Sequence, residues 1–106
     1  MIQILHNQPV KTFDAAAAAT GAGVPFALPA RAGALQWQTF FGTNPATVVI
    51  DLEMSLDNVH WDAVDSTTVV GGEIRTFTII GGKFVRGNIT TITGAGDEVT
   101  MIIVCD

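Results

Sequence analysis

The sequence predicts an all-β protein, an antiparallel β-sandwich of about seven to nine short strands. Two observations predict it. Short apolar or threonine-rich runs are separated by 11 glycines spread along the chain, and regular turn signals around short runs are typical of sandwiches and barrels. One run, residues 47–56, also alternates apolar and polar side chains with the period of two that marks a half-buried strand.

The strand at residues 47–56 ends in a predicted turn. Its expected core-facing residues are Val48, Ile50, Leu52, Met54 and Leu56. The Asp57-Asn58 pair that follows tolerates left-handed backbone and accepts hydrogen bonds from nearby amides, so the chain should reverse there. We expect Trp61 to begin a short strand to about Val64 and to lie back over the preceding strand, closing one end of the core.

Two further strands are predicted after this turn. Residues 73–80 are rich in β-branched side chains, which favour strands. After a Gly81-Gly82 turn, residues 84–92 form the next strand, with Val85, Gly87 and Ile89 expected to face inward. A glycine inside a strand predicts a bulge or a close neighbour at Gly87.

The last strand, residues 98–105, follows a predicted turn at residues 93–96 and differs from the others. Met101, Ile103 and Cys105 share one face with Val99, yet Ile102 and Val104 make the other face apolar as well. A strand that is apolar on both faces is either central in the sandwich or covered by another chain. The pattern leaves both alternatives open.

The first third of the chain has weaker signals. We expect residues 1–22 to form an N-terminal arm or edge strand that partners help to order, and residues 23–106 to form the sandwich domain. The alanine run at residues 15–19 is too short for a stable helix, so a single turn of helix or, in preference, extended chain is expected. Residues 24–28, with two prolines nearby, fit an edge strand.

Residues 35–41 are predicted to form a strand that presents an aromatic ring outward. Leu35 and Trp37 should share one face, opposite Phe40. Because Phe40 and Phe41 are adjacent, one ring should point away from the core unless both faces of the sheet are covered. That ring is either an interface anchor or the end of a strand that curls over the core.

Low charge is the main feature of the composition. Apolar residues make up 48% of the chain and charged residues 14%, whereas soluble domains carry about 25% charged residues. A bland surface and a surface covered by partners both fit this composition. We favour the covered surface, because an isolated soluble monomer usually keeps more charge.

The distribution of charge argues against polyanionic partners. The net charge is −5, and no basic residue lies between Arg31 and Arg75, where six acidic residues occur. We therefore expect no nucleic-acid binding and no binding to an anionic membrane. The N-terminus has no basic leader before a long apolar run, and no stretch approaches 18 apolar residues, so neither a signal peptide nor a membrane span is expected.

The chain offers little for catalysis, so we expect no enzymatic activity and no cofactor. His6 and His60 lie far apart, and no G-x-S-x-G elbow is present. Cys105 lies in an apolar strand without a neighbouring base, which leaves a thiol inert.

The one candidate for a metal site is a set of oxygen ligands of the kind that calcium takes. These are Asp57, Asn58, Asp62 and Asp65. Their spacing does not match a calcium-binding loop. Carboxylates in turns usually face water, so we expect no metal.

Several short motifs, in order, resemble a known family. They are A-A-T-G-A-G at residues 18–23, D-L-E-M-S-L-D-N-V-H-W at 51–61, K-F-V-R-G-N-I-T at 83–90 and a closing V-T-M-I-I-V strand. This pattern resembles small β-sandwich virion proteins of tailed bacteriophages and prophages, with Asn58 in place of a usual glycine. The S-x-D-x-x-x-W turn and the later aromatic-V-R strand are also similar to discoidin-like jelly rolls, which bind sugars or lipids.

The resemblance implies a jelly-roll-like sandwich and a non-enzymatic structural role in a virion, with no catalytic residue. The role it favours is capsid decoration (cement), with a tail-associated role next. The implied partners are the major capsid protein or other virion proteins and further copies of the chain, as a trimer or dimer. The implied location is the capsid surface, after synthesis in the host bacterial cytoplasm.

We expect six apolar residues to make the partner contacts. They are Ile2, Ile4, Phe40, Phe41, Ile102 and Val104. The alternative function is a carbohydrate-binding module on a tail or spike. It would use exposed aromatic rings with polar neighbours, from among Trp37, Trp61, Asp62 and Asn58. Since both tryptophans are expected to be buried, the sequence favours the first function.

Overall fold

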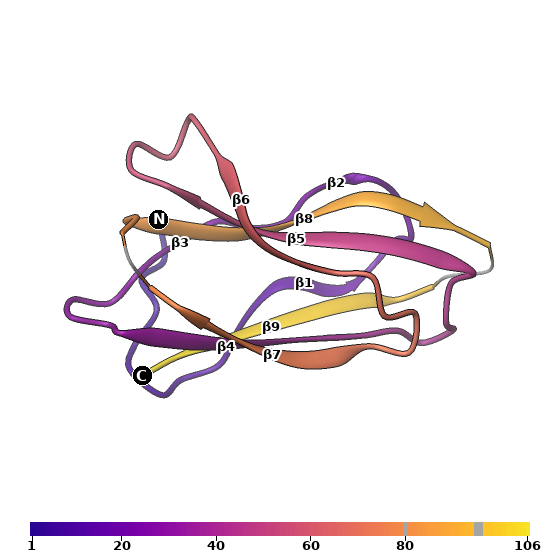
Figure 1. Cartoon of the computed structure of the whole chain (residues 1–106), viewed down its shortest axis with the longest axis horizontal. Coiled ribbons are helices and arrows are strands. Elements are labelled where there is room, and N and C mark those ends of the chain that lie inside the picture. Colours follow the sequence, from indigo (N-terminus) through magenta and orange to yellow (C-terminus); the bar gives the residue numbers. More distant parts are fainter. Residues whose placement is uncertain (80, 95–96) are drawn as a thin grey trace.

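The computed structural model of the chain describes residues 1–79, 81–94 and 97–106, and it consists of two antiparallel sheets packed face to face (Figure 1). The first sheet has the order β1 (Val10–Ala16), β9 (Val99–Cys105), β4 (Ala34–Phe40), β7 (Glu73–Thr78). The second has the order β2 (Gly21–Ala22), β8 (Phe84–Thr93), β5 (Thr47–Ser55), β6 (Asp62–Thr67), and β3 (Phe26–Ala27) also pairs with β8. The predicted all-β sandwich is confirmed.

The strand order is that of a jelly roll. β2 and β3 both pair with β8, and they count as one interrupted strand. Eight strands then form two four-stranded sheets, as in a jelly roll. In the described part of the chain, β5 and β6 are the one consecutive pair that lies side by side in a sheet, and the other connections cross between sheets. The core is therefore assembled from strands far apart in the sequence.

The inward face of β5 is as predicted up to its last position. Val48, Ile50, Leu52 and Met54 are all buried, but Leu56 is 71% exposed. The prediction for Leu56 was wrong because the strand ends at Ser55, whose hydroxyl accepts the backbone amide of Asn58 at 2.9 Å and starts the turn at once. Asn58 has the left-handed conformation that the turn required (φ 61°).

The two C-terminal strands also match their predicted faces. In β8, Val85, Gly87 and Ile89 are buried and point toward the core. In β9, the alternate residues from Val99 to Cys105 are buried, and the strand lies between β1 and β4. The strand is central in its sheet, but the second sheet covers only its inner face, so the half-buried Ile102 and Val104 lie on the outer face of the sheet. Ile80 and part of the predicted turn at residues 93–96 lie outside the described residues.

The N-terminal residues belong to the sandwich. β1 pairs with β9, and a bulge between Lys11 and Phe13 turns both Thr12 and Phe13 inward. Ile4 is fully buried, and its amide donates to the carbonyl of Ala27 at 2.8 Å. The strands on either side of the boundary expected between residues 22 and 23, β2 and β3, both pair with β8. The alanine run overlaps the end of β1, which runs to Ala16, but Ala15 has a left-handed backbone conformation (φ 47°) rather than the extended one expected.

The two tryptophans have opposite positions. Trp37 is 1% exposed and lies in the core, as predicted. Trp61 does not close the core, which corrects the prediction. β6 begins one residue later, with Asp62 opposite the inward-facing Met54, so Trp61 is directed to the other side of the sheet. There its ring lies 4.3 Å from the guanidinium carbon of Arg86.

Among the described residues, no helix has the length and hydropathy of a membrane span.

The close approach of the sheets at Gly87 provides a test of the packing. A β-carbon at this position would lie 2.4 Å from the sulfur of Met101 and 2.9 Å from the ring of Phe13. Gly87→Ala should therefore lower the free energy of unfolding by about 1–3 kcal/mol, the usual effect of overpacking a core. The measurement is the urea unfolding midpoint.

Gly33→Ala is the matched control, because its β-carbon would have only one neighbour within 4 Å, at 3.9 Å. It should change the free energy of unfolding by less than about 0.5 kcal/mol. Equal effects of the two substitutions would contradict the close packing at Gly87.

Candidate interaction surfaces

The outer face of the first sheet carries few charges. Strand register places Ile102 between Lys11 and Gln38, and Gln38 opposite Ile74 on β7. Seven of the outward-facing residues of β4, β7 and β9 are called here the outer apolar face; they are Gln36, Gln38, Phe40, Ile74, Thr76, Ile102 and Val104. Lys11 at the β1 edge pairs with Asp14 at 3.5 Å. The face therefore consists of apolar, amide and hydroxyl side chains.

The most exposed apolar side chains of this face lie on β4 and β7. Ile74 is 61% exposed and Phe40 is 40% exposed, whereas Ile102 and Val104 are half-buried. The structure thus brings three predicted contact residues, Phe40, Ile102 and Val104, onto one face. Sequence reasoning missed Ile74, because β7 carries apolar residues in both phases of its alternation and Phe77 packs against the core.

The other three predicted contact residues lie elsewhere. Ile4 is part of the core, so its side chain is not exposed to a partner in this fold, and that expectation is corrected. Phe41 packs against the core, while Phe40 points outward. Ile2 is exposed, and its carbonyl accepts the amide of Ala27 on β3, which belongs to the opposite sheet. The six residues therefore do not form one surface.

The outer face of the second sheet is polar and internally paired. The Glu53 carboxylate accepts hydrogen bonds from Arg86 Nε at 2.7 Å and Asn88 Nδ2 at 3.0 Å. Arg86 also covers the ring of Trp61. The two outer faces thus differ in character: the first carries few charges, and the second is built around the ion pair of Glu53 and Arg86.

The residues expected for sugar binding do not share a surface. Trp37 is enclosed between the sheets, and Trp61 lies on the outer face of the second sheet under Arg86. Asn58 belongs to the β5–β6 turn. The arrangement therefore lacks the pair of exposed rings that this alternative required.

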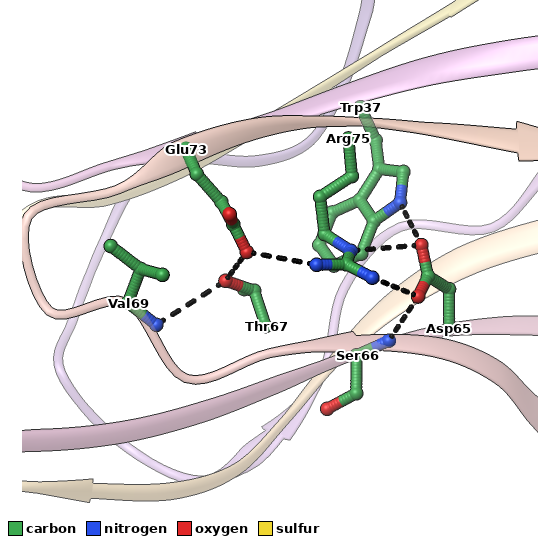
Figure 2. A network of polar contacts seen from close by, with 7 residues as sticks. All are labelled: Trp37, Asp65, Ser66, Thr67, Val69, Glu73 and Arg75. Carbon is green, nitrogen blue, oxygen red and sulfur yellow. Dashed lines mark hydrogen bonds and ion pairs between the residues drawn. The ribbon is translucent and has the colours of Figure 1, made fainter.

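A polar network joins β6 and β7, the edge strands of opposite sheets (Figure 2). The Asp65 carboxylate accepts the indole N–H of Trp37 at 3.0 Å and two donors of Arg75 at 2.9 and 3.0 Å. Glu73 accepts the hydroxyl of Thr67 at 2.5 Å and Arg75 Nη1 at 3.2 Å. The network fastens the two sheets along one edge, and its charges are paired with one another.

Hydrogen bonding determines the ionisation of this network. Burial acts to raise the pKa of Asp65, but hydrogen bonds from Arg75, the Ser66 amide and Trp37 outweigh it and hold the pKa below its usual range. The hydrogen bond to Asp65 in turn raises the pKa of Arg75. Both groups are therefore charged at neutral pH, and neither is poised to exchange protons.

The oxygen ligands considered for calcium point in different directions. Asp57 accepts the backbone amides of His60 at 2.8 Å and Val59 at 2.9 Å, and it pairs with His60 Nδ1 at 2.6 Å. The backbone hydrogen bond from His60 is the main cause that lowers the pKa of Asp57. Asp65 faces the interior network instead. Within residues 1–79, 81–94 and 97–106, no group of three or more potential ligands gathers to hold a metal.

Comparison with known proteins establishes the fold. No protein-family model and no curated protein sequence matches this chain. The crystal structure of the SPBc2 prophage-derived protein YomS is similar, with a TM-score of 0.61 and 19% identity over 98% of this chain and 100% of that one. This chain has the same fold.

A weaker likeness links the chain to a structure of Bacillus endospore appendages described as a novel family of disulfide-linked pili. The TM-score is 0.46 and the identity 21%, over 91% of this chain and 82% of that one.

The interior network predicts how stability depends on Asp65. Asp65→Asn should lower the free energy of unfolding by about 1–3 kcal/mol at pH 7, because it removes a charge that accepts four hydrogen bonds. The pKa of Asp65 is depressed in the fold, so its contribution is present above its ordinary value of 3.8 and is lost as pH falls through the folded value. Urea unfolding of both proteins at several pH values measures the effect.

The difference between the two proteins should therefore shrink below pH 3.8. Asp14→Asn is the matched control, because Asp14 is 70% exposed and pairs loosely with Lys11; it should change stability by less than about 0.5 kcal/mol. A pH-independent difference for Asp65→Asn would contradict the role given to the charge.

Cys105 should be unreactive in the folded chain. Burial, with a smaller effect from the charge of Asp106, raises the pKa of its thiol to about 11. Because the thiolate is the reactive form, labelling by iodoacetamide at pH 8 should be at least about tenfold slower for the folded protein than in urea. Equal rates, measured by mass spectrometry, would show that the C-terminal end of β9 opens readily.

Proposed function

We propose that this protein is a non-enzymatic structural component of a tailed-phage particle, and specifically a capsid decoration (cement) protein. The observation that carries the proposal is the outer apolar face. Ile74 and Phe40 expose apolar side chains there, and Gln36, Gln38 and Thr76 surround them with uncharged groups. Aromatic and aliphatic side chains free of competing charge are typical of the centre of protein interfaces.

Two similarities support the proposed assignment to a phage particle. The fold is shared over nearly the whole chain with a protein described as prophage-derived. The motifs at residues 51–61 and 83–90 resemble those of small β-sandwich virion proteins. In this fold the two motifs lie side by side, since β5 pairs with β8 along its whole length.

The mechanism of stabilisation is burial across subunit boundaries. A face that covers the junction between two shell subunits removes apolar surface of both from water, and each 100 Å² so removed contributes about 2.5 kcal/mol before the entropic cost of association is subtracted. That contribution must be lost before the subunits separate. The proposed partners are the major capsid protein or other virion proteins, on the capsid surface. We also propose that the protein acts as a homo-oligomer, a trimer or dimer, since closed symmetry is the rule for such assemblies.

A non-catalytic role agrees with how the ionisable groups are used. The carboxylates of Glu53, Asp65 and Glu73 accept hydrogen bonds from neighbouring side chains. The Cys105 thiol is buried and has a raised pKa. These groups stabilise the fold, and we propose neither a reaction nor a cofactor.

The proposal is tested with particles assembled without this protein. Purified protein should bind them and raise the temperature at which the shells release their DNA. Ile74→Lys should weaken binding at least about tenfold, because it places a charge on the face that becomes buried. Sedimentation with labelled protein measures binding, and dye access to DNA measures shell rupture.

Val24→Lys is the matched control. Val24 is also an exposed aliphatic residue, 52% accessible, and it lies between β2 and β3, away from the outer apolar face. This variant should bind like the unmodified protein. The proposal fails if the unmodified protein does not bind the particles, or if the two lysine variants bind equally well.

A further inference from the structure

A pocket of about 460 Å³ lies beside the β5–β6 hairpin and the end of β7. The hairpin projects at one end of the sandwich (Figure 1). The size of the pocket falls within the range of ligand-binding pockets. The lining comes from three segments: the hairpin with the start of β6, Phe77 on β7, and the Gly81-Gly82 turn. None of these residues belongs to the outer apolar face.

The pocket has an apolar wall and a polar rim. Met54, Val64 and Phe77 supply apolar surface from three strands. Asp57, His60 and Asp62 supply polar groups from the hairpin. A pocket that combines apolar lining with a few placed polar groups is the usual form of a binding site.

The hairpin holds these groups in fixed positions. The Ser55 hydroxyl accepts the amides of Asp57 and Asn58 at 3.2 and 2.9 Å. Asp57 in turn accepts the amides of Val59 and His60. A turn constrained by four hydrogen bonds loses little conformational entropy when a ligand binds, which favours a preformed site.

The rim carries an excess of one negative charge. Asp57 and His60 form an ion pair at 2.6 Å, so their charges cancel when the histidine is protonated. The hydrogen bond to Asp57 raises the pKa of His60, and the charges of Asp57 and Asp62 act in the same direction. Asp62 has no salt-bridge partner among the described residues. A cation is therefore the complementary group.

We propose that this pocket binds a lysine or arginine side chain presented by a partner protein. Such side chains lay an aliphatic stem along apolar surface and keep a charged head at a polar rim. Here the stem packs against Met54, Val64 and Phe77, and the head meets the Asp62 carboxylate. An acidic side chain is repelled, and a purely aliphatic one leaves Asp62 facing an apolar group. The inference does not depend on the outer apolar face.

The test compares three small probes by amide chemical shifts of the ¹⁵N-labelled full chain. They are the Nα-acetyl methylamides of lysine, norleucine and glutamate. Lysine should shift the amides of residues 54–64, 77 and 82 in a saturable manner. Norleucine, which has the same stem without the charge, should bind several-fold more weakly. Glutamate should cause no shift at these residues.

Two variants locate the site. Asp62→Asn should weaken lysine binding about three- to fivefold, the effect of one partly exposed charge pair, and leave norleucine binding unchanged. Asp14→Asn, which removes an exposed carboxylate on β1, should leave both unchanged. Amides outside the pocket report that each variant is folded.

Three results would overturn the inference. They are the absence of saturable shifts with lysine, equal shifts with lysine and norleucine, and unchanged lysine binding in Asp62→Asn.

Discussion

The close packing of the two sheets is the constraint on which every surface described above depends. Inward-facing residues of β5 and β8 meet those of β4 and β9, and Gly87 lets Met101 and Phe13 approach the opposite sheet. The strands concerned are far apart in the sequence, so none of them has a stable face on its own. Because these faces must turn inward, Ile74 and Phe40 are directed to the outside by the strict alternation of a strand.

One edge of the sandwich carries the polar network that joins the sheets, and one end carries the β5–β6 hairpin with its pocket. Along one edge, Asp65 and Arg75 join β6 to β7 and compensate for the missing strand-to-strand pairing between the sheets. At one end, the β5–β6 hairpin uses Asp57 to organise its own backbone, which leaves Asp62 at the rim of the pocket. Charged residues make up only 14% of this chain, and several of them, such as Glu53, Asp65 and Arg75, are engaged in hydrogen bonds within the fold.

Periodicity predicted most of the fold, because it follows from burial. The core faces of residues 47–54, 84–92 and 98–105 and the position of Trp37 were predicted from alternation alone. Periodicity gave the wrong burial for two side chains that lie one residue outside a strand. Leu56 lies just past the end of β5, and Trp61 lies just before the start of β6. It was ambiguous for β7, where Ile74 and Phe77 are both apolar but face opposite ways. The pairing of Asp65 with Arg75 could not be predicted, since only the jelly-roll topology brings β6 and β7 to one edge.

The proposed burial of the outer apolar face by a partner can be measured by hydroxyl-radical footprinting of the free and the shell-bound protein. Oxidation of Phe40 and Ile74 should fall strongly on binding, while Trp61 and Val24, which lie outside that face, should be oxidised as before. If Trp61 or Val24 were protected while Phe40 and Ile74 remained accessible, the partner would bind another surface and the outer apolar face would not be the interface.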